Sequence, residues 1–176
     1  MPIKAMQESA ERGPYDELYT PAEALSYLLP YLPNGIVWES APGNGDLVRL
    51  LKEGGKKVVW KDRDYFEWEP KEWSIMVTNP PFSMKAAWLR RANELGKPYA
   101  ILLPITTLGA RNCQVELDGA EVLFLPHRID FTGKKNPWFA VAWFTRGLNL
   151  PYPLMFVRGK EHLKGGPTQD VSPPDR

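Results

Sequence analysis

The tetrapeptide Asn79-Pro80-Pro81-Phe82 comes after a short apolar run and carries groups that can orient an amine. The prolines lack an amide hydrogen and fix the backbone, and a residue that precedes proline favours an extended conformation. The side-chain oxygen of Asn79 and the main-chain oxygen of Pro80 can then accept hydrogen bonds from one amino group. Phe82 can stack on a planar ring, which is worth roughly 1–3 kcal/mol for a nucleic-acid base. The alternative is a simple turn and then a core phenylalanine, the usual meaning of an isolated Asn-Pro dipeptide.

A second polar segment, Glu39-Ser40-Ala41-Pro42-Gly43-Asn44-Gly45, comes after an earlier apolar run. Glycines at a strand-to-helix turn let the backbone approach a ligand where a side chain would clash. The carboxylate of Glu39 stands before them and could receive an ammonium group or a ribose hydroxyl. A lone Gly-x-Gly is most often only a tight turn, so a ligand site here needs support from acidic residues further along the chain.

Acidic residues, Asp62 and Asp64, come after the next apolar run. A carboxylate roughly 20 residues beyond a glycine turn is well placed to accept both hydroxyls of a ribose. Asp64 with Tyr65 or Phe66 could hold an adenine ring through one hydrogen bond and an apolar face. The alternative for each acidic residue is a solvated loop position.

The elements that would position these groups alternate between helix and strand. We expect helices over residues 21–31, 46–52 and 83–95. Thr20 and Ser83 have the side chains of N-caps for the first and third of these. We expect buried strands over residues 35–39, 57–61, 74–78, 99–103, 120–125 and 139–145, the last ending the sheet. This alternation predicts an α/β fold, a mostly parallel sheet with helices on both faces, whose ligands bind beyond the carboxyl ends of the strands.

Length and composition indicate one soluble domain. The chain has 176 residues, of which 43% are hydrophobic and 24% charged, as in ordinary globular proteins. We expect a flexible arm over residues 1–18, a single domain over residues 19–158 and a disordered tail over residues 159–176. Without a membrane-spanning run or a signal-type start, we expect a cytoplasmic protein.

The residue types that bind metals are scarce, and the net charge does not distinguish between classes of partner. One cysteine and two histidines exclude a disulfide framework and make a metal centre unexpected. The net charge of +1 neither favours nor excludes nucleic acid. Arg128, Lys134 and Lys135 lie near the expected rim of the site, where substrate contact and solvation are equally plausible, and Trp138 could line a base pocket or fill the core. We expect Arg90-Arg91 to be a solvated helix face.

Together these motifs resemble the class I amino-methyltransferases, and among them the small phage- and prophage-type N6-adenine DNA methyltransferases. The similarity covers roughly residues 18–147 and includes Tyr19-Thr20-Pro21 and the stretches 126–131 and 137–139. It implies a Rossmann-like class I methyltransferase fold, S-adenosyl-L-methionine as cofactor, and direct transfer of its sulfonium methyl group without a metal. A target adenine in duplex DNA would first be flipped out of the stack.

The resemblance also implies roles for individual residues. Those implied in cofactor binding are Tyr19, Thr20, Pro21, Glu39, Ser40, Ala41, Gly43, Asn44, Gly45, Asp62, Asp64, Tyr65 and Asn79. Those implied in catalysis are Asn79, Pro80, Pro81 and Phe82. Those implied in substrate binding are Phe82, Arg128, Lys134, Lys135 and Trp138.

Adenine N6 in DNA is the acceptor that the resemblance favours, although the chain leaves only residues 104–119 and 126–138 as specificity loops. The alternatives are transfer to an RNA adenine or to a protein glutamine, and an inactive methyltransferase-fold subunit. Glutamine enzymes prefer tyrosine at the position of Phe82, and an inactive copy need not keep every group of the site. A dehydrogenase is disfavoured because the glycine turn lacks a third glycine. We expect a monomer.

Overall fold

The sheet of the described residues has seven strands in the order β2-β1-β3-β4-β6-β5-β7. The computed structural model describes residues 20–131 and 139–157. The strands are β1 (Ile36–Glu39), β2 (Lys57–Trp60), β3 (Ile75–Thr78), β4 (Tyr99–Pro104), β5 (Glu121–Phe124), β6 (Val141–Arg146) and β7 (Leu154–Phe156). Neighbouring strands are parallel except at β6, which is antiparallel to both β4 and β5. The mostly parallel sheet predicted from the sequence is confirmed.

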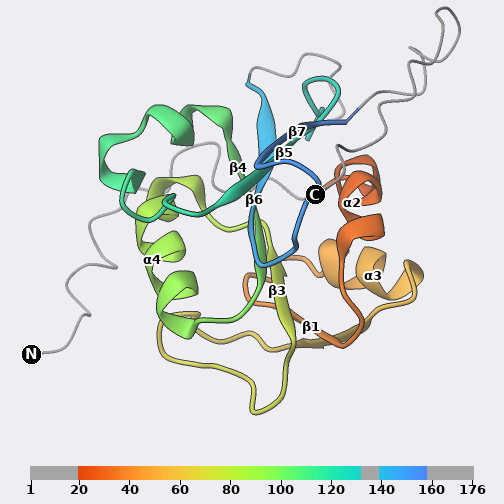
Figure 1. Ribbon diagram of the computed structural model, residues 1–176. Helices are drawn as coiled ribbons and strands as arrows, with labels where there is room; N and C mark the ends of the chain where they lie inside the picture. Colours follow the sequence, from red (N-terminus) through yellow and green to blue (C-terminus); the bar gives the residue numbers. More distant parts are fainter. Residues whose placement is uncertain (1–19, 132–138, 158–176) are drawn as a thin grey trace, which may run out of the picture.

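Helices cover both faces of this sheet. The α-helices are α2 (Ala22–Leu28), α3 (Asp46–Glu53) and α4 (Lys85–Leu95). The 3₁₀ turns are η1 (Leu29–Tyr31), η2 (Phe82–Met84), η3 (Ile105–Gly109) and η4 (Arg111–Cys113). Helices α2 and α3 lie on one side of the sheet and α4 on the other (Figure 1).

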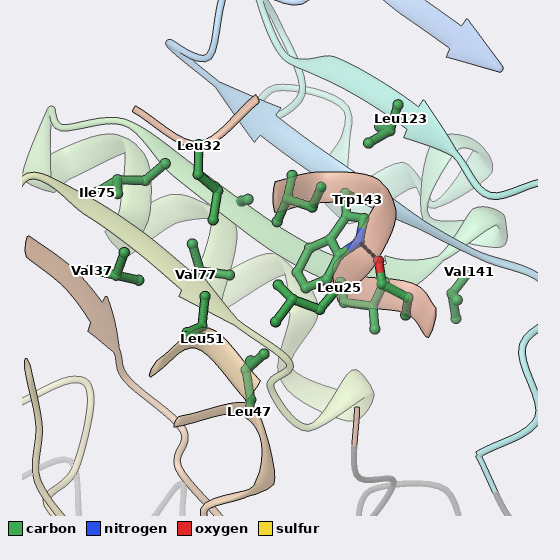
Figure 2. Packing of buried hydrophobic residues seen from close by; sticks show 14 of the residues in the cluster. Leu25, Leu32, Val37, Leu47, Leu51, Ile75, Val77, Leu123, Val141 and Trp143 are labelled. Atoms are coloured by element: carbon green, nitrogen blue, oxygen red, sulfur yellow. Dashed lines mark hydrogen bonds between the residues drawn. The ribbon is translucent and has the colours of Figure 1, made fainter. Parts of the chain in front are cut away.

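Strand alternation divides the buried side chains into two clusters. In β1, Val37 faces the helices α2 and α3, whereas Trp38 faces α4. In β6, Trp143 packs among the leucines of α2 and α3 (Figure 2), and its indole Nε1 donates a hydrogen bond of 2.9 Å to the carbonyl oxygen of Ala24. Because both faces of the central strands are buried, these strands are apolar throughout rather than alternating.

Helix α2 is shorter than the helix expected over residues 21–31, and its N-cap differs. It ends at Leu28 and continues as the tighter turn η1, which contains Pro30, a residue with no amide hydrogen for the α-helical bond. Pro21 occupies the N-cap in an extended conformation, and the hydroxyl of Thr20 has no hydrogen-bond partner. The prediction that Thr20 caps this helix is therefore wrong.

The third expected helix begins two residues late. The chain first makes the turn η2 after Pro81, so that Met84 rather than Ser83 is the N-cap of α4. The expected end of the helix is confirmed, since Gly96 comes next in the left-handed conformation with φ of 66°.

An additional strand, β7, pairs with β5 at the edge of the sheet. The sequence patterns predicted no strand after β6. Strand β7 has only three residues, comes after Pro153, and exposes Leu154 and Phe156, so it lacks the buried apolar run that identified the others.

Two negative findings concern the described ranges only. Within residues 20–131 and 139–157, no helix has the length and apolar character needed to cross a membrane. The same ranges contain no cluster of three or more histidine, cysteine, aspartate or glutamate side chains that could hold a metal ion. The predicted arm over residues 1–18 and tail over residues 159–176 lie outside the described residues.

Candidate active site

The order of strands reverses between β1 and β3, and this reversal defines the site. From β1 the chain passes to β2 on one side, and β3 then pairs with β1 on the other side. Ligands of open α/β sheets bind in the crevice beyond the carboxyl ends of the strands at such a reversal. Glu39 ends β1, and Asn79 is the residue directly after Thr78 at the end of β3. The two motifs singled out in the sequence therefore meet at one edge of the sheet.

Glu39 is a fully buried carboxyl group with only one of its oxygens satisfied. Its Oε1 atom accepts hydrogen bonds from the Thr78 hydroxyl at 2.6 Å and from the amide of Ala41 at 2.8 Å. Its Oε2 atom is also buried and has no partner. A buried acceptor without a donor costs free energy, so this atom marks a place where a ligand donor would be stabilising.

Burial raises the pKa of Glu39 from 4.5 to about 7, against the opposing effect of hydrogen bonds from Thr78 and from the amides of Ala41 and Ser40. The carboxyl group therefore changes its charge near neutral pH. A cationic donor beside Oε2 would favour the ionised form.

Unpaired buried polar atoms concentrate among the residues predicted to bind a cofactor. In the part of the chain that the structure describes, they belong to Thr20, Glu39, Ser40, Trp38 and Thr107. The first three were assigned to cofactor binding from the sequence. Native proteins leave few such atoms unsatisfied, so each of these atoms is a position that a polar group of a ligand could satisfy.

The glycine turn between β1 and α3 has the backbone geometry that glycine allows. Gly43 and Gly45 have φ angles of 49° and 84°, and the Gly45 amide donates to the Pro42 carbonyl at 2.7 Å. A side chain added at Gly45 would meet no atom within 4 Å, so the turn leaves open space beside it. Asn44 closes the turn, because its side chain accepts from the Asp46 amide at 3.0 Å and donates to the Asp46 carboxylate at 2.7 Å.

Asp62 and Asp64 lie after β2 in the loop next to this turn. Trp60 pairs in register with Glu39, and Asp62 lies two residues further along with an exposed side chain. The carboxylate of Asp64 accepts a 2.9 Å hydrogen bond from the Phe66 amide. Asp62 is thus available to a ligand at the edge of the site.

Tyr65 lies in the core rather than on an open face. Its ring is 3% exposed and stacks on Trp88 of α4, with centroids 3.9 Å apart and planes at 4°. Its hydroxyl donates to the Trp88 carbonyl at 3.3 Å, and Arg91 lies 5.5 Å from the ring centroid. Of the two aromatic residues considered for the adenine face, Phe66 is the one that keeps exposed surface.

The tetrapeptide Asn79-Pro80-Pro81-Phe82 follows β3 and is partly buried, and its last residue packs against Phe139. Asn79 is half-buried and Pro80 is buried. The half-buried Phe82 contacts both hydrophobic clusters and meets Phe139 edge-to-face at 5.8 Å. Phe139 in turn lies parallel to Phe131 at 6.1 Å. Phe82 therefore packs against Phe139, which in turn lies against Phe131.

The basic residues differ in their surroundings. Arg128 is exposed on the loop after β5, and the neighbouring His127 pairs with Glu23 of α2 at 3.0 Å. Arg90 pairs with Glu116 at 2.9 Å, and Arg91 donates to the Tyr65 carbonyl at 2.9 Å. The expected solvated face at Arg90-Arg91 is thus only partly correct, because both guanidinium groups have protein partners.

Four candidate residues, Tyr19, Lys134, Lys135 and Trp138, lie outside the described residues. Sequence reasoning missed Thr78, which supplies a hydrogen bond to Glu39. Thr78 is the last residue of a buried strand, directly before Asn79, and nothing in the local sequence marked it as a partner of Glu39.

Comparison with known proteins identifies the fold. No family model and no curated protein matches the chain. Among solved structures, the 23S rRNA methyltransferase ErmE is similar over 73% of this chain and 69% of its own, with 15% identity and a TM-score of 0.50. A structure described as a putative RNA methyltransferase from Pyrococcus horikoshii matches at 15% identity over 73% of this chain and 84% of its own, with a TM-score of 0.48. A dimethyladenosine transferase from Plasmodium falciparum matches at 11% identity over 73% of this chain and 62% of its own, with a TM-score of 0.47. The chain has the Rossmann-like α/β fold of methyltransferases.

Proposed function

We propose that this protein is an S-adenosylmethionine-dependent methyltransferase that modifies an exocyclic amino nitrogen, with adenine N6 in DNA as the acceptor. The observation that carries the proposal is the position of the unpaired Glu39 oxygen. It lies at the strand-order reversal, next to the strand that leads into Asn79-Pro80-Pro81-Phe82.

The residues present fit the cofactor. S-adenosylmethionine offers an ammonium group and two ribose hydroxyls as donors, together with an adenine ring. Glu39 Oε2 is an acceptor suited to the ammonium group, and the exposed carboxylate of Asp62 is suited to the ribose. The open space beside Gly45 lets the backbone approach the ligand. The cofactor supplies an activated methyl group.

The tetrapeptide acts on the acceptor. The Asn79 side-chain oxygen and the Pro80 carbonyl accept the two amine hydrogens, which orients the nitrogen lone pair towards the methyl group. With the cofactor bound, the nitrogen–carbon bond would form as the sulfonium–methyl bond breaks, and S-adenosylhomocysteine would leave. The same two oxygens would stabilise the positive charge on the nitrogen, in a half-buried site, until its extra proton is released to solvent. Phe82 contributes a ring against which the base packs.

Adenine in RNA is the second candidate acceptor. ErmE, the structural neighbour with a TM-score of 0.50, is described as a 23S rRNA methyltransferase. That likeness concerns the fold, whereas the motif resemblance favours DNA. Adenine carries the same amino group in DNA and in RNA, and the methyl transfer is chemically the same. Only an assay with both nucleic acids therefore distinguishes the two acceptors.

The test is methylation of unmodified duplex DNA and of unmodified RNA, measured by nucleoside mass spectrometry after incubation with S-adenosylmethionine. We expect N6-methyladenine in DNA, and a loss of at least roughly 100-fold in rate for Asn79→Ala, since it removes charge stabilisation in the transition state. Asn34→Ala is the control, because Asn34 is an exposed asparagine before β1. If N6-methyladenine forms only in RNA, the acceptor is RNA rather than DNA. Cofactor binding without any methylated product would favour an inactive methyltransferase-fold subunit.

A further inference from the structure

Thr78 directly connects the two halves of the candidate site. It is the last residue of β3 and is fully buried, and its hydroxyl donates to Glu39 Oε1 over 2.6 Å. The next residue in the chain is Asn79. We propose that Thr78 is a positioning residue, which holds the Glu39 carboxylate in its cofactor-binding orientation and fixes it relative to the amine-binding Asn79. This inference rests on the proposed methyltransferase function.

The hydrogen bonds of Glu39 explain how the orientation is set. Two donors, the Thr78 hydroxyl and the Ala41 amide, both reach Oε1. The last torsion of a glutamate side chain is otherwise broad and roughly two-fold. Because both donors select the same oxygen, Oε2 is the atom left for an incoming ammonium group. Without the hydroxyl, only main-chain donors would hold the carboxyl plane.

The same hydroxyl favours the ionised form of Glu39. Burial raises the pKa of this group, whereas the hydrogen bonds from Thr78, Ala41 and Ser40 lower it. No ionised side chain of the described residues is among the causes of the shift, and the neighbour of Glu39 on β2 is the uncharged Trp60. Thr78 is therefore the side chain that keeps Glu39 able to receive a cation near neutral pH.

Two substitutions separate the hydroxyl from the shape of the side chain. Thr78→Val keeps the β-branched shape and removes the donor, whereas Thr78→Ser keeps the donor. Affinity for S-adenosylmethionine is measured by titration calorimetry from pH 6 to pH 9. For Thr78→Val we expect affinity at pH 7 to fall about tenfold, the scale of a lost hydrogen bond to a charged group. We expect the loss of affinity in Thr78→Val relative to the wild type to become smaller towards pH 9, where Glu39 is ionised in both proteins. Affinity itself falls in both proteins above a pH of about 8, because the α-amino group of the cofactor loses its proton. We expect Thr78→Ser to stay within about threefold of the wild type.

Thr145 provides a matched control. It is also fully buried in a strand, β6, and its hydroxyl donates to a glutamate oxygen, Glu121 Oε2, at 3.1 Å. This pair lies at the start of β5, away from the strand-order reversal. We expect Thr145→Val to lower thermal stability and to leave the pH profile of cofactor affinity unchanged.

The outcomes distinguish the inference from the function on which it rests. An unchanged affinity and pH profile in Thr78→Val would overturn the role of Thr78 while methyl transfer by the wild type still stands. Failure of the wild-type protein to bind the cofactor would overturn both. If Thr78→Val does not fold, Thr78→Cys replaces it, because a thiol is a weak donor. We then expect an affinity between those of Thr78→Ser and Glu39→Gln, and an affinity equal to that of Thr78→Ser would overturn the role.

Discussion

The ring of Phe82 meets the ring of Phe139 edge-to-face, with centroids 5.8 Å apart and planes at 88°. The two residues come from different parts of the chain, since Phe82 lies after β3 and Phe139 precedes β6. This contact fixes the aromatic end of the tetrapeptide from outside the tetrapeptide. Residues near the start of β6 therefore influence how an acceptor ring would be held.

Phe139→Leu should lower kcat/KM for the acceptor and leave the affinity for the cofactor unchanged. An aromatic pair contributes about 0.5–1.5 kcal/mol beyond its buried area, so we expect kcat/KM for the acceptor to fall roughly two- to tenfold. Steady-state kinetics with varied acceptor measures this effect, and calorimetry measures the cofactor affinity. Phe156→Leu is the control, because Phe156 is 71% exposed on the edge strand β7. An equal loss in both variants would contradict the role of Phe139.

Glu39 makes the stability of the ligand-free protein depend on pH. Its folded-state pKa of about 7 exceeds the ordinary value of 4.5, so the folded protein binds more protons than the unfolded chain between these values. The contribution of Glu39 to stability is complete below pH 4.5 and is lost as the pH rises through 7. Glu39→Gln does not titrate and avoids this loss.

The free energy of unfolding, measured with urea at pH 5 and at pH 8.5, tests this expectation. We expect the stability of Glu39→Gln relative to the wild type to increase by about 2 kcal/mol between the two pH values. The variant should also bind S-adenosylmethionine more weakly at pH 8.5, because it lacks the carboxylate. A stability difference that does not change with pH would contradict the raised pKa.

Tyr65 and Phe66 should differ in their effects on the cofactor. The Tyr65 ring is buried against Trp88, so we expect Tyr65→Phe to cost about 1 kcal/mol of stability through its lost hydrogen bond and to keep cofactor affinity within about twofold. We expect Phe66→Ala to weaken cofactor binding, since its half-buried ring keeps surface available. Thermal unfolding and calorimetry measure the two properties. If Tyr65→Phe lost more cofactor affinity than Phe66→Ala, Tyr65 rather than Phe66 would be the residue that contacts the adenine.

Trp143→Phe should destabilise the fold without changing the chemistry of the site. The indole is fully buried and donates to the Ala24 carbonyl, so the substitution removes both a hydrogen bond and volume. We expect a loss of about 2–3 kcal/mol in the free energy of unfolding. Trp60→Phe, at a side chain 46% exposed, should change it by less than about 0.5 kcal/mol. Urea denaturation of both variants makes the comparison.

The sequence predicted the central strands, and the position of Glu39 and Asn79 at one edge of the sheet, because both depend on simple patterns. Apolar runs such as Ile75–Thr78 are buried on both faces, and polar residues directly after them must lie at the carboxyl edge of a parallel sheet. Helix starts were less predictable. Thr20 and Ser83 have the chemistry of N-caps, but the backbone set by Pro21 and Pro81 placed the caps elsewhere.

Individual contacts within the site could not be read from the sequence. Tyr65 comes after an acidic residue as an adenine-binding aromatic residue would, and its burial against Trp88 depends on the packing of α4. Thr78 looks like an ordinary strand residue until the register of β3 brings it to Glu39. Such pairings depend on tertiary structure rather than on local spacing.

The hydrogen bond from Trp143 to Ala24 also bears on the order in which the protein can fold. It joins α2 to β6 across 119 residues of sequence. During synthesis, α2 would leave the ribosome long before β6 exists, so its apolar face stays without this partner until residue 143 has emerged. Long-range pairings of this kind slow folding and expose apolar surface in the meantime. Helix α2 therefore has to avoid non-native contacts while the 119 residues from Ala24 to Trp143 are being synthesised.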